Sequence, residues 1–88
     1  MAGLVDTNIL VYRYDPGFPA KQEQATELLR QGIADGSLVL PHQALIEFVA
    51  VVTRPRGARP PLLSVEEASR EVEDLLAQFP VLYPTENT

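Results

Sequence analysis

The sequence predicts an α/β fold with a parallel sheet, and the order and periodicity of its segments support this prediction. Short apolar segments with the composition of strands alternate along the chain with longer segments of helical periodicity. Such alternation is typical of β-α-β units, in which helices pack on a parallel sheet. The 88 residues, of which 45% are hydrophobic and 22% charged, suit one small globular domain. No glycine-rich phosphate-binding motif follows a predicted strand, which excludes the common nucleotide-binding loops.

The first half of the chain is predicted to form two strands and two helices. Residues 3–5 have the composition of a short buried strand, and residues 8–13 can form a short helix. A longer helix is predicted over residues 21–35, and Gly36 is suited to its left-handed C-terminal cap. The inner face of this helix is predicted from the helical spacing of Ala25, Leu28, Leu29, Gly32 and Ile33. Residues 37–40 are the second predicted strand.

The third predicted helix is strongly apolar. Pro41 is suited to its first position, where the missing N–H of proline costs no hydrogen bond. Residues 44–52 are apolar almost throughout, which predicts burial on most sides of this helix. Residues 54–61 contain three prolines, one glycine and three arginines, so we expect a loop. Its arginines could contact a phosphate backbone or could simply be solvated.

A fourth helix and a third strand complete the predicted elements. Ser64 and Glu67 have the spacing of a capping box, which begins a helix, and Pro80 ends it. Its inner face is predicted to consist of Val65, Ala68, Val72, Leu75, Leu76 and Phe79. Residues 81–83 are the third strand. Because residues 85–86 resemble the start of another helix, we expect a larger sheet that is truncated after its third strand.

Composition and charge narrow the possible functions. The chain has no cysteine, which excludes disulfides and thiolate metal ligands. The net charge of −5 disfavours nucleic acid unless the acidic residues hold cations. The sequence lacks a long apolar segment and a signal peptide, so we expect a cytoplasmic protein without a membrane span.

Two acidic residues are candidates for a metal site. Ligands of open parallel sheets bind beyond the C-terminal ends of the strands, and Asp6 directly follows the first strand. Asp6 could ligate Mg²⁺ or Mn²⁺, or it could be the N-cap of the next helix. Glu47 interrupts the apolar third helix, and a buried carboxylate requires a partner or a metal ion. Alternatively, Gln43, Glu47 and Arg54 form one solvated stripe of that helix.

Three segments resemble motifs of PIN domains, a family of metal-dependent ribonucleases. Residues 4–10, LVDTNIL, resemble the opening motif, and residues 40–48, LPHQALIEF, resemble the second motif. Residues 51–55, VVTRP, are similar to VapC-type toxins of toxin–antitoxin systems. The resemblance extends over the whole chain in order and spacing. It implies a three-layer, PIN-like (Rossmann-like) domain, of which residues 1–88 are the N-terminal part.

The resemblance also implies a site and a reaction. Asp6 and Glu47 match catalytic residues of an acidic cluster that binds Mg²⁺ or Mn²⁺, and Thr7 and Asn8 match polar residues that support it. The implied reaction is hydrolysis of an RNA phosphodiester by metal-activated water. The family's remaining acidic residues do not occur before Thr88, so we expect weak activity of this chain. The implied partners are the RNA substrate and a cognate antitoxin protein. A homodimer is also expected, because the first strand would lie at an open sheet edge.

Two other functions are compatible with the same residues. A non-catalytic PIN-like module could bind RNA or a protein, and a complete acidic cluster would distinguish the nuclease from it. A phosphoryl-transfer enzyme could use Asp6 as its nucleophile, but that class usually has a second Asp where this chain has Asn8. Tyr12 and Tyr14 could stack on nucleic-acid bases or could pack against the protein.

Overall fold

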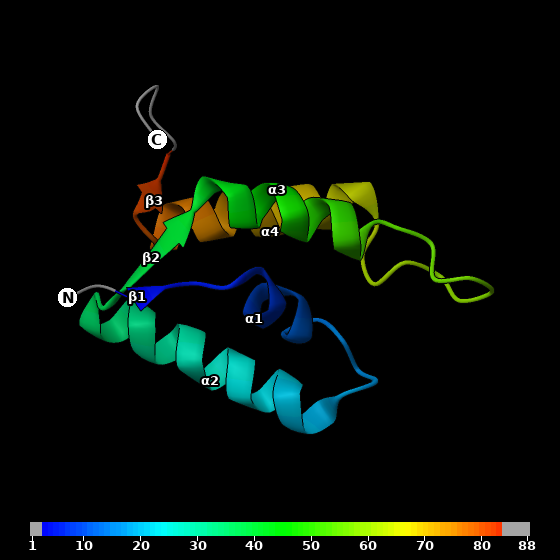
Figure 1. Ribbon diagram of the computed structural model, residues 1–88, viewed down its shortest axis with the longest axis horizontal. Coiled ribbons are helices and arrows are strands. Elements are labelled where there is room, and N and C mark those ends of the chain that lie inside the picture. The colour runs from blue at the N-terminus through cyan, green and yellow to red at the C-terminus, as the bar shows by residue number, and fades with distance from the viewer. Residues whose placement is uncertain (1–2, 84–88) are drawn as a thin grey trace.

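The computed structural model describes residues 3–83 and shows a mixed α/β fold (Figure 1). The elements are, in chain order, β1 (Gly3–Leu4), α1 (Thr7–Tyr12), α2 (Pro19–Asp35), β2 (Leu38–Pro41), α3 (His42–Val52), α4 (Val65–Gln78) and β3 (Val81–Leu82). The strands form one sheet in the order β1-β2-β3, and both strand pairs are parallel. The prediction of an α/β fold with a parallel sheet is therefore confirmed. The helix start predicted at residues 85–86 lies outside the described residues.

The helices cover one face of the sheet. Val5 and Leu40 point to this face, are almost completely buried, and belong to one core cluster to which all four helices contribute. On the opposite face, the side chains of Leu4 and Leu82 are 62% and 53% exposed. The prediction that the first strand is buried is thus correct for Val5 and wrong for Gly3 and Leu4. Residues 3–83 form two layers, one of strands and one of helices. The predicted three-layer domain would have a second layer of helices on the other face of the sheet, and residues 3–83 do not supply it.

The core lies between the sheet and the helices. Its largest fully buried side chains are Phe48, Leu10, Leu29, Leu40, Leu75 and Val52. They come from β2 and from each of the four helices, so every helix is anchored by at least one apolar side chain. This arrangement fixes the start of α1 against α3, the pair of helices that carries the candidate site.

Several element boundaries differ by one or two residues from the sequence prediction. Helix α2 begins at Pro19, two residues earlier than expected, because proline is well accommodated in a first helical turn. Pro41 is the last residue of β2 and the N-cap of α3, and not the first helical residue. Its ψ of 136° is extended, and its register partner on β3 is Leu82. Pairing with β3 therefore delays the start of α3 by one residue.

Helix α2 buries a narrower stripe than its periodicity predicts. Leu28 and Ile33 are 42% and 41% exposed, so their predicted burial is wrong. Gly32 is buried, and a Cβ atom at this position would lie 2.1 Å from a side-chain carbon of Leu38. Because Gly32 has no side chain, α2 approaches β2 closely at Leu38. Gly36 ends the helix with a φ of 66°, which confirms the predicted cap.

Helices α3 and α4 lie side by side (Figure 1) and are also more exposed than predicted. On α3, Ile46 is 51% exposed and Val51 is 38% exposed. On α4, Val65 and Leu76 are 68% and 45% exposed, so they do not belong to the inner face. Each helix meets the core on one side only, and no part of residues 3–83 covers its outer side. No helix in the described part of the chain has both the length and the apolar character needed to cross a membrane.

Candidate metal site

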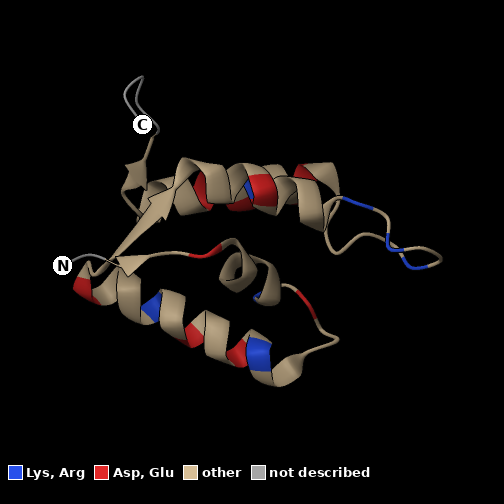
Figure 2. Cartoon of the chain, in the orientation of Figure 1, with Lys and Arg blue, Asp and Glu red and all other residues tan. Residues whose placement is uncertain are grey.

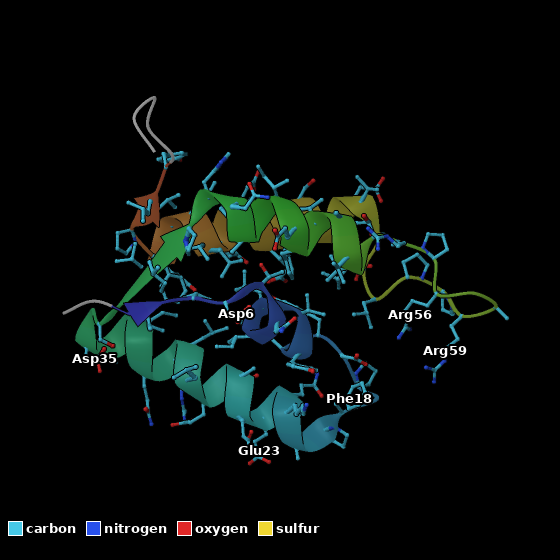
Figure 3. All side chains as sticks on the ribbon, viewed as in Figure 1. Asp6, Phe18, Glu23, Asp35, Arg56 and Arg59 are labelled. Carbon is cyan, nitrogen blue, oxygen red and sulfur yellow. The ribbon has the colours of Figure 1, made fainter. Side chains whose placement is uncertain are left out.

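The structure joins the two sequence motifs that contain the candidate acids. The hydroxyl Oγ1 of Thr7 donates a hydrogen bond to Oε2 of Glu47, and the two atoms are 2.8 Å apart. Thr7 is the first residue of α1, whereas Glu47 lies in the middle of α3. Figure 3 shows Asp6 at the start of α1, directly after β1. The segment that follows the first strand and the third helix therefore meet where both motifs carry polar side chains.

Asp6 is the N-cap of α1. Its Oδ1 accepts a hydrogen bond from the backbone N–H of Asn8 at 3.0 Å, and its backbone is extended. Within residues 3–83, Oδ2 accepts no hydrogen bond and contacts no cationic side chain. Both interpretations of this residue thus fit the structure, because capping uses one oxygen and leaves the other available for a cation.

Glu47 is exposed, so the prediction of a buried carboxylate is wrong. Its Oε1 accepts a hydrogen bond from Nε2 of Gln43 at 3.3 Å, and Oε2 accepts the one from Thr7. Gln43 and Glu47 share one polar stripe of α3, as the alternative interpretation proposed. Arg54, the third predicted member of this stripe, makes no ion pair with Glu47 in the described structure. The negative charge of Glu47 consequently has no cationic side chain beside it within residues 3–83.

The donor atoms at this place suit a hard cation. Asp6 and Glu47 carry carboxylate oxygens and Thr7 carries a hydroxyl oxygen. Mg²⁺ is commonly bound through one or two carboxylates, with water and substrate phosphates as further ligands. Zinc is disfavoured, since the chain has no cysteine and its one histidine, His42, packs against the ring of Tyr83 at 5.0 Å between centroids. Residues 3–83 contain no group of three or more His, Asp or Glu side chains placed to hold a metal ion.

The two tyrosines near the end of α1 have different environments. The ring of Tyr14 lies 5.5 Å from that of Phe48, and its hydroxyl donates to Glu71 on α4 at 2.5 Å. Burial, together with this hydrogen bond, raises the pKa of Tyr14 far above its usual value of 10. Tyr14 therefore packs against the protein. Tyr12 lies beside Lys21, whose Nζ is 4.7 Å from the ring centroid, at the start of α2.

A separate apolar groove lies between α3 and α4. Its volume is about 380 Å³, and its lining residues are His42, Leu45, Ile46, Val49, Val72, Leu76 and Tyr83. Neither Asp6 nor Glu47 lines it. The candidate metal site is thus an open, polar arrangement on the surface and not part of this groove.

No protein-family model matches this chain, and no curated protein or solved structure is significantly similar to it. The α/β class of the fold is defined by the structure itself.

Proposed function

We propose that this chain is the N-terminal part of a PIN-like, metal-dependent endoribonuclease, and that the protein is the toxin of a toxin–antitoxin pair. The observation that supports this proposal is the hydrogen bond between Thr7 and Glu47. It connects the Asp-Thr-Asn motif after β1 with the glutamate of α3, although 40 positions separate the two residues. The resemblance to PIN domains requires these two motifs to meet, and an unrelated helical surface has no such requirement.

In this proposal Asp6 and Glu47 hold Mg²⁺ or Mn²⁺. Such an ion lowers the pKa of a bound water and neutralises charge that develops on a phosphodiester. Thr7 and Gln43 each donate to a different oxygen of Glu47 and restrict its orientation. The N–H of Asn8 fixes the Asp6 carboxylate in the same way. The neighbours thus orient the two carboxylates before a cation arrives, which reduces the cost of ordering them.

A non-catalytic module that binds RNA or a protein is the second candidate. It is favoured by the small number of acidic ligands, because residues 3–83 bring two carboxylate-bearing segments together and no cluster of three. Hard-cation affinity rises with the number of charged ligands, so two carboxylates imply weak binding of Mg²⁺. The nuclease and an RNA-binding module both bind RNA, and only the nuclease cleaves it.

Cleavage of a single-stranded RNA by the purified chain, with millimolar Mn²⁺ or with EDTA, tests the proposal. We expect slow, Mn²⁺-dependent cleavage that Asp6→Asn and Glu47→Gln each reduce about 100-fold, because a misplaced reacting group already costs a factor of that size. Glu23→Gln is the matched control, since Glu23 is an exposed carboxylate on α2, away from Asp6 (Figure 3). RNA binding without any Mn²⁺-dependent cleavage would identify the chain as the binding module. Cleavage that survives both site substitutions would show that Asp6 and Glu47 are not the catalytic acids.

A further inference from the structure

The connection between α3 and α4 concentrates positive charge on an acidic protein. Residues 54–61, which we name the basic finger, contain three of the seven Lys and Arg residues of the chain and no acidic residue. The net charge of the whole chain is −5. Figure 2 shows blue segments without any red along the finger, whereas α2, α3 and α4 all carry red segments. The finger is therefore an isolated basic surface.

The basic finger has a defined backbone structure. Arg56 and Arg59 form an antiparallel bridge, with N–H to carbonyl distances of 3.3 Å and 3.1 Å. Nε of Arg56 also donates to the carbonyl of Pro60 at 3.0 Å. The turn between them uses Gly57 at a φ of 65°, a conformation that other residues rarely adopt. These contacts make the finger a tight hairpin, which extends beyond the ends of α3 and α4 (Figure 1).

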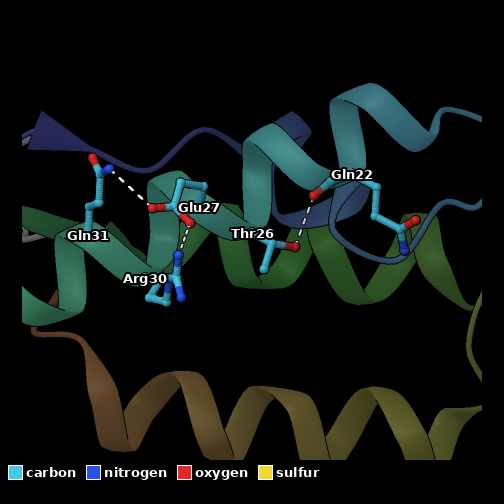
Figure 4. Close-up of polar contacts among 5 residues, drawn as sticks. All are labelled: Gln22, Thr26, Glu27, Arg30 and Gln31. Atoms are coloured by element: carbon cyan, nitrogen blue, oxygen red, sulfur yellow. Dashed lines mark hydrogen bonds and ion pairs between the residues drawn. The ribbon is translucent and has the colours of Figure 1, made fainter.

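The guanidinium groups of Arg54 and Arg59 are accessible. Both residues are exposed, and within residues 3–83 their side chains make no hydrogen bond or ion pair. By contrast, Arg30 on α2 forms an ion pair with Glu27 of the same helix (Figure 4). The charges of the finger are thus available to an external anion without breaking an internal contact.

The side chains of the basic finger suit a phosphate backbone better than a protein surface. A guanidinium group presents planar, paired N–H donors that match phosphate oxygens. Arginine also occurs at the energetic centres of protein interfaces, but it is accompanied there by tryptophan and tyrosine, and residues 54–61 contain no aromatic residue. Phosphate contacts position a nucleic acid and do not read its sequence.

Helix α3 connects the basic finger with the candidate metal site. The finger follows α3, and Glu47 lies five residues before the last residue of that helix, Val52. At 1.5 Å per residue this corresponds to about 8 Å along the helix axis. The finger begins beyond this helix end, so a stacked strand that contacts both the finger and Glu47 spans at least about two or three nucleotide steps. Along the longest axis of the molecule, Asp6 lies near the middle, and Arg56 and Arg59 lie toward one end (Figure 3).

The geometry points to a binding function for this segment: the basic finger holds the phosphate backbone of single-stranded RNA and leads the strand toward Asp6 and Glu47. The choice of RNA rests on the proposed function. The binding itself requires neither a metal ion nor cleavage, so it is measured separately from them.

Fluorescence anisotropy of a labelled RNA of about 12 nucleotides, in EDTA, measures this binding between about 50 and about 200 mM salt. Each phosphate contact contributes about 0.7 to the slope of log affinity against log salt. The double variant Arg54→Ala, Arg59→Ala is expected to reduce the slope by about 1.4. Between the lowest and the highest salt concentration, the wild type therefore loses affinity by a factor about seven times larger than the factor that the variant loses. Arg56 is retained, because its side chain holds the hairpin.

Two further variants make the result specific. Arg30→Ala, Arg70→Ala removes the same charge from α2 and α4 and is expected to keep the wild-type slope. Arg54→Lys, Arg59→Lys keeps the charge of the finger and is also expected to keep most of the slope. An equal loss in the α2 and α4 variant would overturn the inference, since it would attribute binding to overall charge. Circular dichroism of each variant confirms that its helices are intact.

The remaining outcomes separate this inference from the proposed function. RNA binding that depends on Arg54 and Arg59, without Mn²⁺-dependent cleavage, would support the inference and contradict the proposed nuclease function. Cleavage and RNA binding that do not depend on Arg54 and Arg59 would support the nuclease function and contradict the inference. Tighter finger-dependent binding of a glutamate-rich peptide of equal charge would overturn it in favour of an acidic protein partner.

Discussion

Thr7 connects segments that lie 40 positions apart in the sequence. Its backbone begins α1, and its hydroxyl donates to the Glu47 carboxylate on α3. Gln43, one helical turn before Glu47, donates to the other oxygen of the same carboxylate. Because each donor restrains a different oxygen, the carboxylate is held in one orientation. The orientation of the Glu47 carboxylate therefore depends on the packing of α1 against α3, through the hydroxyl of Thr7.

Thr7→Val removes this hydroxyl while nearly preserving the shape of the side chain. We expect the free energy of unfolding to fall by about 0.5–1 kcal/mol, the usual contribution of one hydrogen bond, because the contact is exposed to water. A double-mutant cycle with Glu47→Ala, measured by urea denaturation, isolates the pairwise part. The affinity for Mn²⁺ is expected to fall about tenfold, since Thr7 orients a proposed ligand. Thr7→Ser keeps the donor and serves as the control. Strict additivity in the cycle would show that the hydrogen bond does not form in solution.

At the level of elements, α4 begins at the capping box that the sequence predicts. The hydroxyl of Ser64 accepts a hydrogen bond from the N–H of Glu67 at 3.1 Å, and the Glu67 carboxylate accepts one from the N–H of Ser64 at 3.0 Å. Two N–H groups that the helix itself cannot satisfy are paired in this way. The box fixes where α4 starts, and hence where the basic finger ends. The sequence alone was sufficient for this prediction because all its partners lie within four residues.

Ser64→Ala is expected to lower the free energy of unfolding by about 1 kcal/mol, because it removes the N-cap acceptor of α4. Ser69→Ala is the matched control, since Ser69 is exposed inside the same helix and accepts no capping bond. Urea denaturation of both variants, followed by circular dichroism, measures the difference. Equal stability of the two variants would contradict a stabilising role for the box.

The same box predicts a dependence on pH. The N–H of Ser64 holds the pKa of Glu67 below its usual value of 4.5. The unfolded chain therefore takes up this proton more readily than the folded one. The contribution of Glu67 is fully present above pH 4.5 and is lost as the pH falls through the lowered pKa of the folded state. In acid, the stability of the wild type should fall more steeply than that of Glu67→Gln, and parallel curves would contradict this account.

In the molecule as a whole, residues 3–83 leave one face of the sheet uncovered, and both edge strands, β1 and β3, pair on one side only. Strand β1 pairs with β2 on one side and lies at the edge of the three-stranded sheet. The side chains of Leu4 and Leu82, on the face away from the helices, are more than half exposed. An open strand edge beside an apolar face favours pairing with another chain. A symmetric dimer is the commonest form of such pairing.

We therefore expect the purified chain to form a dimer as its concentration increases, measured by size-exclusion chromatography with light scattering. Leu4→Lys places a charge on the uncovered sheet face and should shift the chain toward the monomer. Leu28→Lys is the control, because Leu28 is also an exposed leucine and lies on α2, outside the sheet. A wild-type chain that stays monomeric at every concentration would show that this face does not associate. Equal effects of the two variants would attribute association to net charge.

The sequence by itself determined the features that depend on near neighbours. The helices, the Gly36 cap and the Ser64–Glu67 box follow from residue spacing and backbone preference within a few positions, and the structure confirms them. The alternation of strands and helices likewise determined the parallel sheet. The roles of Asp6 and Glu47 stay predictions, since the motifs suggest a chemistry that the fold alone does not test.

Only the tertiary structure decided which apolar side chains are buried and which polar groups meet. Helical spacing predicts that one face is apolar, but not how many neighbours cover it. On the same helix Phe48 is fully buried, whereas Ile46 is half exposed. The hydrogen bond between Thr7 and Glu47 was likewise absent from any local pattern, because its partners meet only when α1 packs against α3. Local spacing is set along the chain, whereas burial and long-range contacts depend on how elements distant in the sequence pack together.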